Sequence, residues 1–253
     1  MGVDIALIVR TALGVVVMVA LALVLLRWQR IPIGWQPVIA VVRAAVQLTA
    51  IALILRGVLA APWTVLLFVA LMLSTASLTS GGRLSQLEGG RRAAVLGVLA
   101  GGITVPLLVI CGSLVELAPA PIIAISGIVI GSTMTAATLS GRHFAAAARA
   151  ASGQIEAWWA LGASSPVAHD QVRRTAVHEA LIPGLDQTRA TGLVTLPGAF
   201  VGALFGGASP WEAARFQLLV LVALLLAQTM TALVSTAVLS RSTHLPRLQA
   251  DKK

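Results

Sequence analysis

The sequence predicts an all-α, polytopic membrane protein with about seven transmembrane helices. Of its 253 residues, 58% are hydrophobic and only 11% are charged, and the mean hydropathy is +0.93. Soluble domains carry about a quarter charged residues. The apolar residues also form runs long enough to cross the roughly 30 Å hydrocarbon layer of a bilayer. Composition and run length together therefore place the chain in the membrane.

The apolar runs give seven expected spans. They are residues 5–26, 38–59, 63–79, 93–112, 122–139, 191–207 and 216–239. The first is expected to be retained rather than cleaved, because Asp4 stands where a signal peptide carries positive charge and the run is too long for a signal. The sixth is the shortest and carries Pro197 and Gly198 near its start.

The basic residues set the expected orientation. With the N-terminus outside and the C-terminus inside, all but four of the 18 Lys and Arg residues fall in inner segments. Cytoplasmic loops of membrane proteins carry this excess of positive charge. The basic balance thus reflects membrane sidedness rather than nucleic-acid binding, and we expect a multi-pass protein of the inner or plasma membrane.

Several activities lack the residues they would need. Lysine occurs only at Lys252 and Lys253, so the chain has no P-loop of its own. Ion coupling needs ionisable groups at membrane depth, yet no carboxylate falls in the middle of an expected span. The four histidines all fall in expected cytoplasmic segments and the single Cys111 allows no disulfide. We therefore expect no enzyme, no catalytic residue and no cofactor.

A few residues within the spans are candidates for a translocation path. Arg43 and Gln47 share one helix face, Met134 follows a small polar stretch, and Pro197-Gly198 is typical of a discontinuous helix near a transport site. Each has a simpler interpretation: Arg43 can reach the interface, Met134 can fill the core, and Pro197 can merely kink the helix.

Glycine spacing leaves a similar choice open. Gly97/Gly101, Gly127/Gly131 and Gly198/Gly202/Gly206 each place small residues on one helix face. Such faces allow close helix approach. The contact is either packing within the subunit, which we favour for single pairs, or a dimer face or gate.

Residues 140–190 form one long polar segment, which the orientation places in the cytoplasm. An alanine-rich helix is expected over residues 142–160, with Phe144, Ala148, Ala151, Ile155 and the two tryptophans on one side. Gly162 fits its end, Ser164 fits an N-cap, and Pro166 begins a second helix that stops before Pro183. This helix-turn-helix suits docking to a partner, although Trp158 and Trp159 could instead rest on the membrane interface. The four histidines are expected to be solvated.

The segment resembles the EAA-type coupling loop of ABC transporter permeases, through Glu156-Ala157 and the glycine six residues after the glutamate. Trp158 replaces the second alanine of that motif. A longer resemblance, to FetB-type permeases of iron-export ABC transporters, covers the whole chain. Its segments are Arg43–Leu48, Ile128–Met134, Leu161–Ala163, Glu179–Pro183, Asp186–Thr188 and Thr191–Gly198.

The resemblance implies one transmembrane permease domain over residues 1–253, forming a homodimer with two copies of a separate cytosolic ABC ATPase. The coupling loop, residues 140–190, would enter the ATPase through residues near its turn. These are Glu156, Ala157, Trp158, Trp159, Leu161, Gly162, Ala163, Ser164, Ser165 and Pro166.

The substrate implied is iron or another metal, which links the protein to metal homeostasis. Side chains that bind iron are carboxylates, imidazoles and thiolates, whereas the expected spans offer Cys111 and scattered methionines. An anionic organic solute such as a nucleotide sugar is the alternative within transport, and Arg43 suits it. A membrane scaffold that anchors a cytosolic enzyme is the alternative outside transport.

Overall fold

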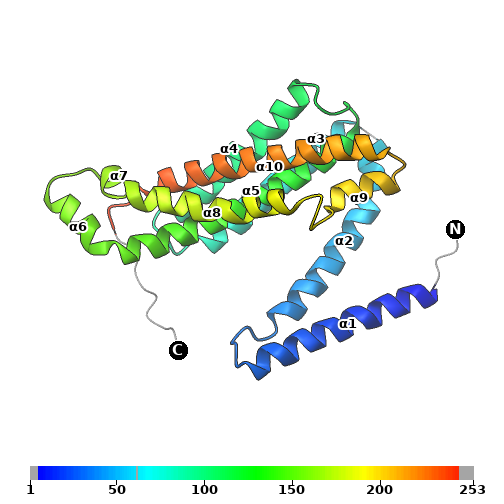
Figure 1. The fold of residues 1–253 in the computed structure, drawn as a ribbon, viewed down its shortest axis with the longest axis horizontal. Coiled ribbons are helices and arrows are strands. Elements are labelled where there is room, and N and C mark those ends of the chain that lie inside the picture. The colour runs from blue at the N-terminus through cyan, green and yellow to red at the C-terminus, as the bar shows by residue number, and fades with distance from the viewer. Residues whose placement is uncertain (1–4, 61, 245–253) are drawn as a thin grey trace. The chain divides into compact units, whose positions relative to one another are not determined.

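The computed structural model describes residues 5–60 and 62–244, whose regular elements are ten helices (Figure 1). Their bounds are α1 Ile5–Trp28, α2 Gln36–Ala60, α3 Pro62–Arg83, α4 Gly90–Cys111, α5 Pro119–Ala150, α6 Ser152–Ala160, α7 Ser165–Ala168, α8 Asp170–Ala190, α9 Gly198–Phe205 and α10 Pro210–Leu239. The all-α fold is therefore confirmed for these residues.

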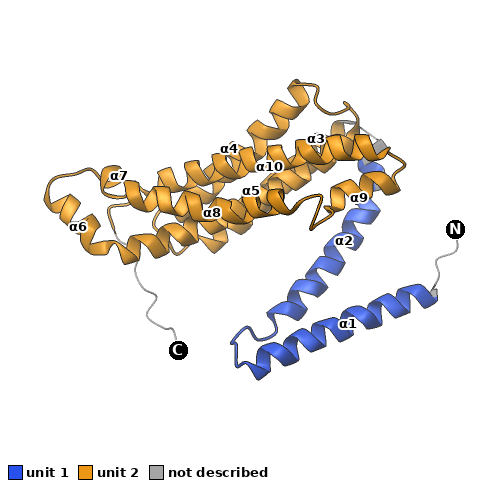
Figure 2. Cartoon of the chain, viewed as in Figure 1, with its two compact units in different colours: residues 1–60 blue, residues 61–253 orange. Residues whose placement is uncertain are grey.

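The chain divides into two compact units, residues 1–60 and 61–253 (Figure 2). The first unit contains α1 and α2, whose apolar side chains are mostly exposed, as suits helices surrounded by lipid. The guanidinium of Arg27 at the end of α1 lies 4.9 Å from the centre of the Trp35 ring, just before α2. This cation–π contact links the two ends of the connection between the helices.

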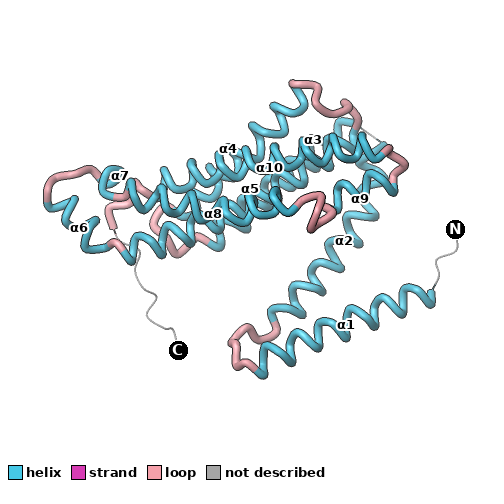
Figure 3. The backbone as a smooth tube through the Cα atoms, viewed as in Figure 1, coloured by secondary structure: helices cyan, strands magenta, loops and turns pink. Residues whose placement is uncertain are grey.

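The second unit is a bundle in which α3, α4, α5, α8 and α10 pack together (Figure 3). One core cluster joins Val105 of α4, Ile125 of α5 and Val220 of α10. A second cluster joins Phe144 of α5 and Leu239 of α10. Because α5 and α10 both run from the first cluster to the second, they are parallel. The segment that connects them must therefore return along the length of the bundle.

Two glycines let α4 approach α10 closely. A Cβ at Gly97 would lie 2.1 Å from the Oγ of Ser235, and one at Gly101 would lie 2.5 Å from the carbonyl oxygen of Ala227. The hydroxyls of Thr231 and Ser235 donate to the carbonyls of Gly97 and Ala93 across the same contact. Gly97/Gly101 thus serves packing within the subunit, the interpretation favoured from the sequence.

The other glycine faces differ. A Cβ at Gly127 would meet the Met72 methyl at 2.9 Å, whereas a Cβ at Gly131, Gly198 or Gly202 would have no atom of the described chain within 4 Å. The glycine face of α9 is therefore open, and its two interpretations both remain.

Six helices are long and apolar enough to cross a membrane among the described residues, and they coincide with six of the seven expected spans. The expected sixth span, residues 191–207, is not a continuous helix. Residues 191–197 form a turn with a bridge between Thr191 and Thr195, and α9 has only eight residues. At about 1.5 Å per residue, α9 is about 12 Å long and cannot span a bilayer by itself. Pro197, the last residue of this segment, has extended backbone at the N-cap of α9, so helix resumes at Gly198.

Helix boundaries in the polar segment also differ from the prediction. The helix expected to begin at residue 142 is the continuation of α5, which reaches Ala150 without a break. Four consecutive alanines after Phe144 favour uninterrupted helix. The break falls at Ala151, and the separate helix α6 ends at Ala160 as expected.

The second helix of the segment is longer than predicted. A four-residue α7 comes first, and α8 then runs through Pro183 to Ala190 instead of stopping near residue 179. A proline inside a helix costs about 3 kcal/mol. The packing of α8 against α5 and α10 offsets this cost.

Candidate functional site

The turn after α6 has the Schellman geometry expected at Gly162. The Gly162 amide donates to the Trp159 carbonyl over 2.9 Å, and the Ala163 amide donates to the Trp158 carbonyl over 3.0 Å. Gly162 has φ +82°, in the left-handed region that glycine enters without steric cost. The turn is therefore a fixed structure rather than a loose loop.

The chain then enters α7 through Ser164, which occupies the N-cap position with extended backbone, and Pro166 lies in the first turn. The Ser164 side chain makes no capping hydrogen bond. The next hydroxyl, Ser165 Oγ, donates instead to the carbonyl of Ser242, beyond the end of α10. The start of α7 is thereby tied to the end of the bundle.

The two neighbouring tryptophans have different surroundings. Trp159 is half-buried and packs edge-on against His169, with ring centroids 5.6 Å apart. Trp158 on the next position is 43% exposed. Of the two, only Trp158 is available to a partner, while Trp159 helps to hold α6 against the bundle.

His169 lies between α7 and α8 and is only 1% exposed, which contradicts the expectation that all four histidines are solvated. Its ring stacks on Phe144 at 5.6 Å, and its Nδ1 lies 2.8 Å from the carbonyl oxygen of Ser165. Phe144 of α5 and Trp159 of α6 both pack against the ring, which accounts for its burial. His169 is therefore a structural residue under the turn.

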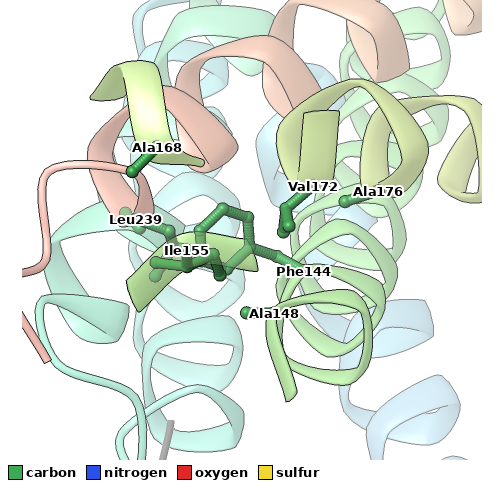
Figure 4. Packing of buried hydrophobic residues seen from close by; sticks show 8 residues of the cluster. Phe144, Ala148, Ile155, Ala168, Val172, Ala176 and Leu239 are labelled. Atoms are coloured by element: carbon green, nitrogen blue, oxygen red, sulfur yellow. The ribbon is translucent and has the colours of Figure 1, made fainter. Parts of the chain in front are cut away.

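The helix-turn-helix rests on a continuous core (Figure 4). Phe144 and Ala148 of α5, Ile155 of α6, Ala168 of α7, Val172 and Ala176 of α8 and Leu239 of α10 form this cluster. The predicted apolar side of the alanine-rich segment is thus largely confirmed: Phe144, Ala148 and Ile155 are buried. The turn is held rigidly to the ends of α5 and α10.

The outer surface beside the turn is a groove of about 470 Å³ between α6 and the start of α8. Its lining residues are Ala151, Gln154, Ile155, Trp158, Pro166, Val167, Ala168, Asp170, Gln171, Val172 and Arg173. The side chain of Leu161, at the tip of the turn, is 81% exposed, and Val167 is exposed as well. Exposed apolar residues beside a rigid turn suit insertion into a partner's surface.

Charges mark one wall of the groove. Arg173 donates to the carboxylate of Asp170 over 2.9 Å, and Arg174 does so over 2.8 Å. The hydrogen bond from Arg173, supported by Arg174, lowers the pKa of Asp170. Asp170 is also in the first turn of α8, where negative charge is favourable.

The predicted path residues come from both compact units. Arg43 and Gln47 are exposed on α2 in the first unit, whereas Met134 packs against the cluster of Ala76, Val98 and Ile130 in the second. Pro197 and Gly198 mark the break between the turn at residues 191–197 and α9. Within each unit, Arg43 and Gln47 lie one helical turn apart on α2, and Pro197 and Gly198 are adjacent at the start of α9.

The sulfur atoms considered for metal binding are also dispersed. Met72 and Met134 pack against one cluster and Met230 against another, while Cys111 is exposed at the end of α4. Among residues 5–60 and 62–244, no three His, Cys, Asp or Glu side chains are grouped as metal ligands would be.

Two contributors to the site were missed from the sequence. Ser242 and Glu88 join the turn to the α3–α4 connection, because Ser242 Oγ donates to Glu88 Oε2 while its carbonyl accepts from Ser165. The Ser242 hydroxyl, with His244 beside it, lowers the pKa of Glu88. No local pattern signals pairs that lie 154 residues apart. The burial of His169 could have been suspected from the aromatic residues nearby.

Comparison with known proteins agrees with this architecture. Residues 9–244 match the uncharacterised protein family UPF0014. The UPF0014 membrane protein STAR2 of rice is 32% identical over 222 residues, which cover 86% of this chain and 77% of the rice protein. Protein ALUMINUM SENSITIVE 3 of Arabidopsis thaliana is 30% identical over 223 residues, covering 87% and 81% of the two chains.

The protein of Escherichia coli K12 called "Probable iron export permease protein FetB" is 31% identical over 134 residues, or 53% of this chain and 51% of that protein. No solved structure matches the chain significantly. With a family match over nearly its full length and six helices able to cross a membrane, the chain is a multi-pass membrane protein that belongs to the UPF0014 family.

Proposed function

We propose that this protein is the membrane permease subunit of an ABC transporter and that it exports iron or another metal with energy from a separate cytosolic ATPase. The observation that carries the proposal is the rigid turn at Gly162, which presents Trp158, Leu161 and Val167 outside the long apolar helices. A motor subunit needs such a fixed element to transmit its movement. The turn is fastened to α5 and α10, so a push on it reaches the membrane helices.

Two further observations support an external motor. The chain's only lysines are Lys252 and Lys253, and neither follows a glycine-rich loop of the P-loop type. The relative from Escherichia coli is named as an iron export permease. We place the turn in the cytoplasm, with the N-terminus outside, because Arg83, Arg91, Arg142 and Arg149 lie toward the same end of the bundle. The permease acts as a homodimer, since one chain offers few helices for a complete path.

An anionic organic solute is the second candidate for the cargo. The dispersal of Met72, Met230 and Cys111 over separate parts of the fold favours it over a metal bound directly by side chains. Transport assays in proteoliposomes with ferrous iron and with a nucleotide sugar separate the two cargoes.

The test of the coupling role is the ATPase activity of the purified chain in lipid, with and without a candidate P-loop ATPase. Gly162→Trp is compared with wild type, and Leu117→Trp, in the exposed connection between α4 and α5, is the matched bulky control. We expect Gly162→Trp to abolish activation and Leu117→Trp to preserve it. If no ATPase associates, or if Gly162→Trp behaves as wild type, the membrane-scaffold function replaces the permease.

A further inference from the structure

The far end of α8 carries charged side chains whose position along the bundle is fixed by α10. Val172 and Ala176 of α8 pack in the cluster that contains Leu239, the last residue of α10. Farther along α8, a Cβ at Gly184 would lie 2.2 Å from Oε1 of Gln228. The two helices are therefore antiparallel, and Gly184 is level with Gln228.

This register places the end of α8 at the depth of the hydrocarbon layer. With 30 residues, α10 is about 45 Å long at 1.5 Å per residue. The hydrocarbon layer is about 30 Å thick, so at most about 15 Å of α10 lies outside it, divided between the two ends. Wherever the layer is placed along the helix, the central stretch of about 15 Å of α10 therefore lies inside it. Gln228 lies 11 residues before Leu239, or about 16 Å from that end, and Arg189 lies about 8 Å deeper. Both levels fall inside the central stretch.

Asp186 and Arg189 form an ion pair at this depth. Arg189 Nη1 lies 3.4 Å from Asp186 Oδ1, and the two side chains are 77% and 63% exposed, respectively. Charged side chains at hydrocarbon depth are costly in contact with lipid and face a partner or a water-filled cavity instead. The second unit leaves most of both side chains uncovered, so water or a solute can meet this requirement.

The backbone after α8 gives an independent indication of water at the same level. Residues 191–197 are not helical, although two amides, those of Val194 and Thr195, still donate to the Ala190 carbonyl. Leu193 at the tip is 98% exposed, so the rest of the second unit does not cover this turn. Irregular backbone within the hydrocarbon region is tolerated only where protein buries it or water surrounds it.

We propose that the end of α8 and the turn at residues 191–197 line a water-filled translocation path, where Asp186 and Arg189 contact a charged, water-soluble solute near the middle of the membrane. The inference rests on the proposed permease function and adds to it the residues that meet the cargo. Pro197 and Gly198, predicted from the sequence as path residues, form the opposite edge of the same helix break.

Cysteine accessibility tests the path without any need for ATPase. In a Cys111→Ser background in nanodiscs, the variants Asp186→Cys and Arg189→Cys are treated with a charged, membrane-impermeant methanethiosulfonate. Leu226→Cys and Val222→Cys on α10 are the depth-matched controls, because both side chains are exposed at nearly the same levels. Gln187→Cys, which leaves the ion pair intact, replaces either charged-residue variant that does not fold.

We expect the α8 cysteines to react at least about tenfold faster than their controls, because a thiol forms its reactive thiolate in water and not in lipid. Equal rates overturn the proposal. Slow labelling with a disulfide-linked dimer at Arg189→Cys also overturns it, because a second copy would then cover the pair. If the α8 cysteines are labelled quickly but the protein binds no ATPase, the water-filled path is supported and the proposed permease function is contradicted.

Discussion

Gly184 of α8 lies directly against Gln228 of α10, so that a Cβ on the glycine would stand 2.2 Å from the amide oxygen. This contact sets how far α8 advances along the bundle. The colliding atom is the end of a flexible side chain, so a single methyl can be accommodated when Gln228 rotates. A larger side chain cannot be accommodated without a shift of α8.

We therefore predict that Gly184→Ala retains the wild-type melting temperature within a few degrees, while Gly184→Leu lowers it by an amount equivalent to about 1–3 kcal/mol of overpacking. Thermal unfolding of the purified variants in detergent measures the difference. Equal melting temperatures for the two variants would mean that α8 is not held at this register.

The contact between α4 and α10 is expected to be less tolerant. A Cβ at Gly97 meets the Ser235 hydroxyl at 2.1 Å and the backbone oxygen of Thr231 at 2.9 Å. Because the backbone cannot rotate away, Gly97→Ala should destabilise the protein by about 1–3 kcal/mol. Gly131→Ala is the control, since its site on α5 is open. Unfolding in detergent that ranks the two variants equally would contradict the close approach of the helices.

The two tryptophans separate stability from partner binding. Trp159→Ala removes the edge-on contact with His169 and should cost about 2 kcal/mol of stability, less than for a fully buried tryptophan. Trp158→Ala should leave the unfolding temperature unchanged and weaken ATPase binding by at least about tenfold, as for an exposed interface residue. Melting curves and binding titrations with the ATPase measure the two effects. If Trp158→Ala lowered the stability and Trp159→Ala weakened ATPase binding, Trp159 rather than Trp158 would face the partner.

Glycine is required at position 162 because of the backbone conformation there, and not because a side chain would clash with neighbouring atoms. A Cβ at this position would have no atom of the described chain within 4 Å, but the φ of +82° is unfavourable for side chains. We expect Gly162→Ala to cost about 1 kcal/mol and Gly162→Asn less, because asparagine tolerates left-handed backbone. Chemical denaturation of both variants, monitored by tryptophan fluorescence, tests this order. A cost that rises with side-chain size would indicate a clash instead.

The link between Glu88 and Ser242 should depend on pH. The Ser242 hydroxyl lowers the pKa of Glu88, so folding favours the ionised carboxylate. The contribution of ionised Glu88 to the folding stability is fully present above the ordinary glutamate pKa of about 4.3. It is lost as the pH falls through the lower pKa of Glu88 in the folded protein. The protection factors of residues 241–244, which correct the exchange rates for the slower intrinsic exchange in acid, should therefore decrease as the pH falls, and Glu88→Gln should reproduce that state at neutral pH. Unchanged exchange in Glu88→Gln would show that this link does not hold the segment.

Local patterns predicted much of this molecule. Apolar runs located six membrane helices, and the Gly162 and Ser164-Ser165-Pro166 signals located the turn to within one residue. The continuation of α8 through Pro183 could not be predicted, because only packing against distant helices offsets the cost of an internal proline. For the same reason, a polar segment that composition assigns wholly to the cytoplasm has its last turns beside Gln228.

The central claim is that the turn at Gly162 docks an ATPase, and cross-linking in lipid tests it most directly. A photoreactive residue is introduced in place of Leu161 at the tip of the turn, and in place of Leu117 between α4 and α5 as the control. The account predicts a cross-link between position 161 and a co-expressed P-loop ATPase, and none from position 117. An ATPase that binds the protein but cross-links at neither position, or equally at both, would contradict it.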